Sequence, residues 1–137
     1  MPDKTSLYAP LLVETAWEVC NQVGGIYTVV RSKAPEIVDK WAGNYCMVGP
    51  LLHSKLPAEF EEGFDYDDAF GQAVLEMRKL GFEIHYGRWL TDGKPKVVLM
   101  PPTQVYDKMK DIRTTLLNDH KINIFNPDDL LQQVIAF

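Results

Sequence analysis

Hydrophobic and polar residues along the chain follow two spacings, one typical of strands and one typical of helices. A short apolar run at 11–15 is rich in strand formers and precedes a glycine pair, which predicts a buried strand. From Ile26 to Trp41 apolar residues recur at steps of three and four, which predicts a helix with one buried face. Pro35 lacks a backbone N–H, so we expect it to kink this helix or to start a second segment.

The same patterns predict further elements downstream. Strands are expected at 45–48, ended by Gly49-Pro50, at 82–86 with an extension toward Trp89, and at 97–100. The stretch 51–65 is predicted to be a loop. Asp67 or Asp68 can cap a helix over 70–80, and Gly81 suits its end. The Asp92-Gly93 pair is a hairpin signal.

The last third of the chain carries two more predicted helices. Thr103 can cap a helix whose apolar face includes Ile112 and Leu116. Asn126 and Pro127 predict the start of another helix, which stays apolar up to Phe137 without a stop signal. We therefore expect the chain to be a piece of a longer protein, and we expect this apolar face to drive self-association.

The order of these elements predicts one α/β domain. Strands alternating with helices favour a mostly parallel sheet with flanking helices and one inserted hairpin. The length of 137 residues fits one domain, and a composition of 46% hydrophobic and 24% charged residues is typical of a globular protein.

Charge and composition exclude several function classes. The net charge of −5 argues against nucleic-acid binding, which needs a basic surface. No apolar run approaches the roughly 20 residues of a membrane span, and the N-terminus does not resemble a signal peptide, so we expect a cytoplasmic protein without a membrane partner. Cys20 and Cys46 are expected to be buried thiols, and His53 and His120 have no neighbours at metal-ligand spacing. No metal or cofactor is predicted.

The best candidate for a ligand site is the strand–loop–helix unit around Gly24-Gly25. Glycines without Cβ let a ligand approach the backbone and permit positive φ, and the following helix N-terminus offers free N–H groups to a diphosphate. The loop also follows the carboxyl end of a strand, where open α/β sheets bind ligands. A glycine pair alone is a weak signal, and by itself it favours a plain tight turn over a phosphate site.

Other polar residues have simpler interpretations. His85 lies in an alternating strand and is interpreted as a structural or surface histidine. Glu14 and Glu18 could pair as glycosidase carboxylates, but nothing in the sequence fixes their separation, so this hypothesis ranks low. Trp89 is interpreted as a core residue.

The residues around the glycine pair resemble a known family. The segment WEVCNQVGGIYTV at 17–29 resembles the opening signature of animal and fungal glycogen synthases, which are retaining glucosyltransferases with the two-domain GT-B fold. The segments NYCMVGP at 44–50 and YGRWL at 86–90, followed by VVL at 97–99, agree with that family in order and spacing. The resemblance extends over nearly the whole chain.

This resemblance implies a fold, an activity and a set of ligands. The chain would be an incomplete N-terminal Rossmann-like domain over 1–137, without the C-terminal domain that carries the family's carboxylates, so no catalytic residue is assigned. In the full enzyme, glucose would pass from UDP-glucose to the non-reducing end of an α-1,4-glucan such as glycogen. Gly24 and Gly25 would lie against the donor diphosphate, and the chain alone would be inactive.

Two positions depart from the family pattern. The family usually has a lysine before Val-Gly-Gly, and this chain has Gln22, which can donate a hydrogen bond but cannot neutralise charge. Arg31 and Lys33 are the nearest cations in the sequence that could replace it. The segment PPTQVYD at 101–107 instead resembles a loop of bacterial ADP-glucose-dependent synthases, which makes Tyr106 a candidate substrate contact.

Three hypotheses for function therefore stay open. The first is the N-terminal part of a UDP-glucose-dependent glycogen synthase. The second is an ADP-glucose-dependent starch or glycogen synthase. The third is a non-catalytic α/β module that binds glucan or another protein, in which the glycine pair is only structural.

Overall fold

The structure is a computed structural model that describes residues 10–63, 66–104 and 109–121. The strands form one sheet in the order β1-β2-β5-β4-β3. Their bounds are β1 (Leu12–Thr15), β2 (Tyr45–Pro50), β3 (Phe60–Glu62), β4 (His85–Trp89) and β5 (Lys96–Met100). The helices are α1 (Gly25–Trp41), the short 3-10 helix η1 (Ala42–Asn44), α2 (Ala69–Lys79) and α3 (Met109–His120).

The pairing of the strands gives a mixed sheet in which four of five strands share one direction. β1 pairs with β2 and β2 with β5 in parallel, whereas β4 is antiparallel to both β5 and β3. The predicted mostly parallel α/β sheet with flanking helices is therefore confirmed, and the β4–β5 pair is the hairpin that Asp92-Gly93 predicted. Gly93 adopts a φ of +84°, which explains the need for glycine there.

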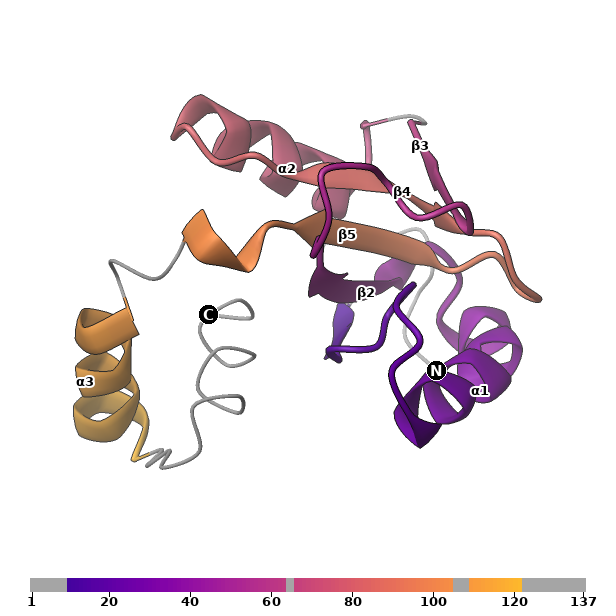
Figure 1. The fold of residues 1–137 in the computed structure, drawn as a ribbon, viewed down its shortest axis with the longest axis horizontal. Helices are drawn as coiled ribbons and strands as arrows, with labels where there is room; N and C mark the ends of the chain where they lie inside the picture. Colours follow the sequence, from indigo (N-terminus) through magenta and orange to yellow (C-terminus); the bar gives the residue numbers. More distant parts are fainter. Residues whose placement is uncertain (1–9, 64–65, 105–108, 122–137) are drawn as a thin grey trace.

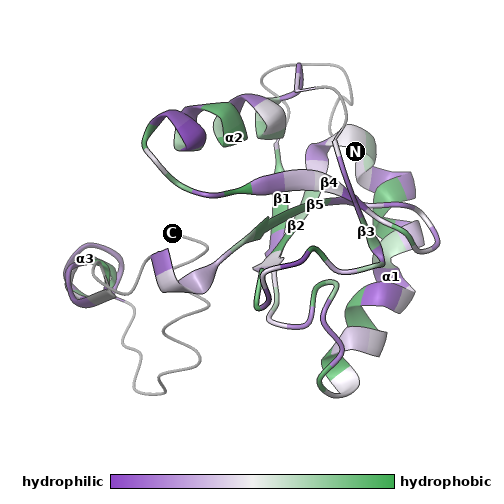
Figure 2. Cartoon of the chain, turned by 45° about the horizontal axis from the view of Figure 1, so that its top comes forward, coloured by the Kyte–Doolittle hydropathy of each residue, from purple (hydrophilic) through white to green (hydrophobic). Residues whose placement is uncertain are grey.

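Helices α1 and α2 lie on opposite faces of this sheet (Figure 1). Residues of β2 alternate between two cores, because neighbouring side chains of a strand point to opposite faces. Tyr45 and Met47 belong to a cluster with the apolar face of α1, and Cys46 belongs to a cluster with Phe70 and Val74 of α2. Figure 2 shows β2 and β5 as hydrophobic strands between two helices of mixed polarity.

Several element boundaries differ from the sequence prediction. The helix α1 runs unbroken past Pro35, which therefore does not start a second segment. β2 includes Gly49 and Pro50, which were predicted to end it. A proline is tolerated there because it is the last residue of the strand, and the N–H of the next residue, Leu51, donates to the carbonyl oxygen of Met100 on β5 (2.8 Å). β3 lies in the stretch predicted as a loop, and its three residues are too few to show a periodicity.

The start of β4 was also predicted too early. The backbone N–H of Glu83 donates to the side-chain oxygen of Gln104 (2.5 Å), and the Gln104 amide donates back to the Glu83 carbonyl (2.8 Å). These bonds replace pairing with a neighbouring strand, so the strand begins only at His85.

The predicted helix ends can be compared where the structure describes them. The Asp68 side chain caps α2 by accepting from the N–H of Gly71 (2.6 Å), and Gly81 follows the helix with a φ of +93°. Both predictions are confirmed. Thr103 lies in a short 3-10 turn at 102–104, and α3 is described from Met109. The helix predicted from Asn126 lies outside the described residues.

The expectation about the two cysteines can be compared with the structure. Cys20 and Cys46 are both buried and free, as predicted. No helix in the described ranges is long and apolar enough to cross a bilayer.

Candidate functional site

The loops that follow β1, β2 and β5 lie together at one edge of the sheet. These three strands are parallel, so their carboxyl ends share that edge, which is where ligands bind in open α/β sheets. The loop after β1 contains the glycine pair and leads directly into α1. This loop is therefore the centre of the candidate site.

Backbone contacts hold the first half of this loop against the sheet. The N–H of Ala16 donates to the carbonyl of Val48 in β2 (3.1 Å), and the N–H of Val19 donates to the Ala16 carbonyl (3.3 Å). A Cβ on Gly49 would lie 2.8 Å from the Cβ of Val19, so glycine is needed for this close approach. Cys20 takes a left-handed φ of +57°, which turns the chain back toward the helix.

The carboxylate of Glu18 lies beneath the glycine pair. Its Oε1 accepts from the N–H of Val23 (3.0 Å) and from the N–H of Gly24, and only 8% of the residue is exposed. The Gly24 N–H holds the pKa of Glu18 below its usual range, with weaker help from other amides at the start of α1 and against the opposing effect of burial. The loop amides thus already face a negative charge from the chain itself.

The two glycines present different surroundings. Gly24 precedes α1 with a φ of −152°, and Gly25 is its first residue, so neither glycine has the positive φ that the sequence analysis allowed for. A Cβ on Gly24 would lie 3.7 Å from Glu18 Oε1, whereas a Cβ on Gly25 would meet nothing within 4 Å. The open backbone face is therefore at Gly25.

Gln22 is exposed, as are all residues from 22 to 26. The cations suggested as its replacements are engaged elsewhere. Lys33 pairs with Glu14 near the end of β1, and the Arg31 guanidinium donates to the Thr91 hydroxyl (2.7 Å) in the β4–β5 hairpin. The structure gives no sign that either one serves the loop.

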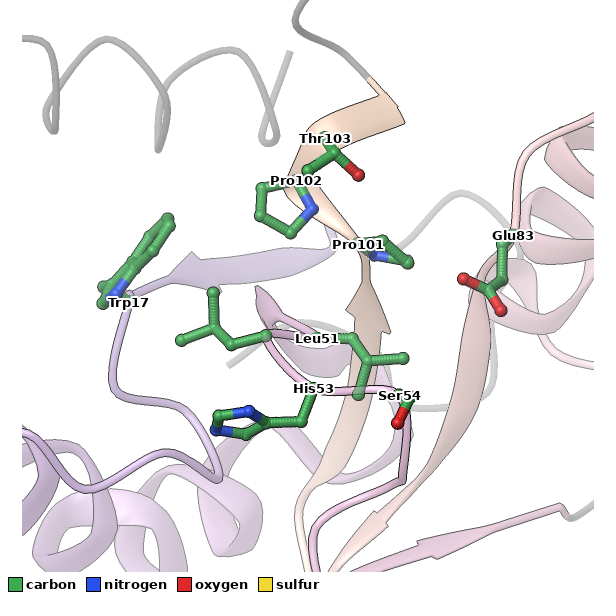
Figure 3. Close-up of a pocket in the computed structure, with 9 residues that line it drawn as sticks. Trp17, Leu51, His53, Ser54, Glu83, Pro101, Pro102 and Thr103 are labelled. Carbon is green, nitrogen blue, oxygen red and sulfur yellow. The ribbon is translucent and has the colours of Figure 1, made fainter.

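A cavity of about 450 Å³ opens at the same edge of the sheet. Figure 3 shows Trp17 and Glu83 at its opposite ends, with Leu51 between them. A second cavity of about 270 Å³ is lined by Cys20 and Asn21 of the glycine loop and by His53 and Lys55 after β2. These residues were not predicted from the sequence to form a site, although their position after parallel strands is the signal that identifies them.

The remaining candidates have structural partners. Glu14 accepts from the hydroxyl of Tyr45 (2.8 Å) and pairs with Lys33, and Glu18 binds the loop, so both carboxylates of the glycosidase hypothesis are occupied. The ring of His85 pairs with Glu62 on β3. Trp89 is fully buried in the core on the α1 side, as expected. Tyr106 lies outside the described residues.

Comparison with known proteins now places the chain. A family model described as glycogen synthase matches residues 14–137. The chain belongs to the glycogen synthase family. Residues that carried the resemblance in the sequence, including the glycine loop, fall within this match.

Individual relatives agree with this family. The chain is 46% identical to the liver glycogen (starch) synthase of Homo sapiens over 89 residues, which is 65% of this chain and 13% of that protein. It is 36% identical to the glycogen (starch) synthase of Neurospora crassa over 127 residues, which is 93% of this chain and 18% of that protein. It is 38% identical to the glycogen (starch) synthase of Caenorhabditis elegans over 115 residues, which is 84% of this chain and 17% of that protein. The chain spans less than a fifth of these relatives' lengths.

Proposed function

We propose that the chain is the first part of the N-terminal Rossmann-like domain of a glycogen synthase with the GT-B fold. In the complete enzyme, glucose passes with retention from UDP-glucose to the non-reducing end of an α-1,4-glucan. The observation that carries this proposal is the family match over 14–137, combined with an exposed glycine loop at the carboxyl end of β1. A cytoplasmic location follows from the same proposal.

Within this chain, the donor's diphosphate lies against the open face of the loop. Gly25 supplies backbone without a side chain, Gly24 shapes the turn, and the amide of Gln22 donates a hydrogen bond where the family usually has a cation. Tyr106 is a further proposed substrate contact. The cavity between Trp17 and Glu83 leaves room for the rest of the donor or for the glucan end.

The first prediction concerns the two loop positions that face solvent. In the full-length enzyme, Gln22→Lys should tighten UDP-glucose binding by roughly fivefold, because a partly screened cation near phosphate contributes on the order of 1 kcal/mol. Gly25→Val should weaken binding, because its side chain fills the open face while the fold has room for it. Isothermal titration with UDP-glucose at low and high salt measures both effects, and the gain from lysine should shrink at high salt.

A matched control separates a local from a general charge effect. Thr28→Lys adds the same charge at an exposed position farther along α1 and should change donor affinity much less than Gln22→Lys. If neither loop variant alters donor affinity while both stay folded, the loop is only a turn and its phosphate role is wrong. Repeating the titration with ADP-glucose tests the second donor, which the PPTQVYD segment favours.

A second prediction tests the proposed domain organisation. The purified 137-residue chain should transfer no measurable glucose from UDP-glucose to glycogen, because the groups that stabilise the leaving diphosphate belong to a second domain in this proposal. A radiolabel assay with the full-length enzyme as positive control measures the transfer. Turnover by the isolated chain would contradict the proposal, and a full-length protein without any transferase activity would favour the glucan- or protein-binding module.

A further inference from the structure

We infer that Glu18 is a positioning residue for donor binding: its carboxylate fixes the glycine loop from the inside, so that the outer face of the loop meets the diphosphate preformed. The inference rests on the proposed role of the loop and adds a residue that does not itself touch the donor. It is carried by the contacts of one buried carboxylate with the backbone of the loop.

The helix α1 has no ordinary N-terminal cap. Gly24 precedes the helix and has no side chain to cap it, and the first turn of α1 contains no acidic residue. The first N–H groups of a helix need an acceptor, and the positive end of the helix dipole favours an anion. Glu18 places an anion at this helix end from upstream in the chain. Its carboxylate accepts from the N–H of Gly24, the residue that precedes α1, and from the N–H of Val23 before it.

The carboxylate and the proposed ligand face lie on different sides of the loop. Glu18 is buried, and the Cβ position of Gly24 points toward its Oε1 at 3.7 Å. Gly25 has empty space around its Cβ position, and Gln22 is exposed. A diphosphate over Gly25 and Gln22 therefore does not need to displace the carboxylate, which argues for positioning and against competition.

Hydrogen bonds and a tight turn next to Glu18 hold its carboxylate in position. The N–H of Asn21 donates to the Glu18 carbonyl (3.2 Å), and the Asn21 amide donates to the carbonyl of Trp17 (3.3 Å). Cys20 is held at a φ of +57°, a conformation that costs energy for a residue with a side chain and persists only when its surroundings enforce it. This tight turn aims the acid at the loop amides.

Loss of the carboxylate should free the loop. Two glycines in a row have many accessible conformations, and donor binding would then have to order them. The cost would appear in donor affinity and not in the chemical step. A residue that supported only the overall fold would affect donor and acceptor alike.

The test uses the full-length enzyme with Glu18→Gln, which keeps the shape of the side chain and removes its charge. We expect the KM for UDP-glucose to rise roughly fivefold, because the glutamine oxygen can still accept from the loop amides and only the extra strength that the charge gives these bonds is lost. The kcat and the KM for glycogen should be nearly unchanged. Hydrogen–deuterium exchange should be faster in peptides covering 22–26 without donor, and saturating donor should restore protection.

Glu14→Gln is the matched control, because it removes a neighbouring carboxylate that bonds Tyr45 and Lys33 but no loop amide. It should leave the donor KM and the exchange of the loop unchanged. A lower donor KM in Glu18→Gln would show that the acid competes with the donor and would overturn the inference, as would unchanged loop exchange. If Gly25→Val leaves donor binding intact, the proposed loop role fails, whereas faster exchange in Glu18→Gln still reports the loop contact independently.

Discussion

Replacing Asp68 by alanine is expected to lower the free energy of unfolding by about 3 kcal/mol, because one carboxylate holds three different parts of the fold. Its Oδ1 accepts from the N–H of Gly71 and caps α2 (2.6 Å). Its Oδ2 accepts from the hydroxyl of Tyr86 on β4 (2.7 Å) and pairs with the ammonium of Lys96 on β5. The Lys96 side chain is only 11% exposed, so without Asp68 its charge has no carboxylate partner and keeps the carbonyl of Gly43 (3.0 Å) and the ring of Phe70 (5.8 Å to its centroid).

Urea denaturation followed by tryptophan fluorescence measures this loss. Asp68→Asn should cost less than the alanine variant, because an asparagine can still cap the helix and accept from Tyr86. Glu36→Ala removes an exposed partner of Lys40 within α1 and should change stability by no more than about 0.5 kcal/mol. An Asp68→Ala protein as stable as the Glu36→Ala control would show that the network contributes little.

The contacts of Asp68 should also contribute to the loss of folding stability at low pH. Burial alone would raise the pKa of Asp68, but the hydrogen bonds from Lys96, Gly71 and Tyr86 outweigh it and lower that pKa below its usual value. A carboxyl group whose pKa is lower in the folded state stabilises the fold above its unfolded pKa, about 3.9, and this contribution is lost as pH falls through the folded value. Unfolding free energies measured from pH 6 to pH 3 should therefore fall less steeply for Asp68→Asn than for the parent protein.

Much of the fold follows from local signals that the sequence states directly. Asp68 before an apolar helical pattern and Gly81 after it mark the ends of α2, because capping and left-handed turns depend on single residues. The Asp92-Gly93 turn gives the hairpin for the same reason. The continuous apolar run at 97–100 correctly indicated a strand deep in the sheet, with neighbours on both sides.

Features that depend on distant contacts could not be predicted in this way. Lys96 is 28 residues from Asp68, and no spacing rule links a strand lysine to a helix cap. β3 forms because Phe60 packs in the core and lies opposite Trp89 of β4. A segment of three residues is too short for its sequence pattern to predict this pairing. The late start of β4 depends on the side chain of Gln104, 21 residues away.

The candidate site also combines one feature that could be predicted from the sequence and one that could not. The position of the glycine loop at the carboxyl end of β1 followed from the order of elements, but the place of Glu18 did not. A glutamate in a loop has several rotatable bonds, and only the turn at Cys20 directs it beneath Gly24. The missing cap of α1 is the signal in the sequence that could have identified it, because a helix that starts on two glycines needs an acceptor from elsewhere.

The structure also explains why a family-like segment can be structural. In the YGRWL segment, the Tyr86 hydroxyl binds Asp68, and Trp89 is fully buried beside α1 with its ring 5.6 Å from that of Tyr27. Arg88 reaches the carbonyl of Lys94 across the hairpin (2.9 Å). These three side chains make contacts that hold the sheet together. The resemblance to the family in this segment is therefore explained by the shared fold and not by ligand binding.

Gly87, in the middle of that segment, is expected to tolerate no side chain. It faces Glu62 of β3 and Val97 of β5 in the sheet. A Cβ there would overlap the carbonyl oxygen of Glu61 and lie 2.8 Å from its carbonyl carbon and 2.9 Å from the Cα of Glu62. These are backbone atoms of a paired strand, which cannot move aside without breaking the pairing of β3 with β4.

Gly87→Ala should therefore lower the free energy of unfolding by about 3 kcal/mol or more, the upper end for overpacking a closely packed site. Urea denaturation reports the loss, and hydrogen exchange in peptides covering 60–62 should accelerate first because β3 is the strand displaced. Gly25→Ala is the control: a Cβ there meets nothing within 4 Å, and alanine is the better helix former, so stability should stay equal or rise by up to about 1 kcal/mol. Equal stability of Gly87→Ala and the parent protein would mean that β3 does not approach β4 this closely.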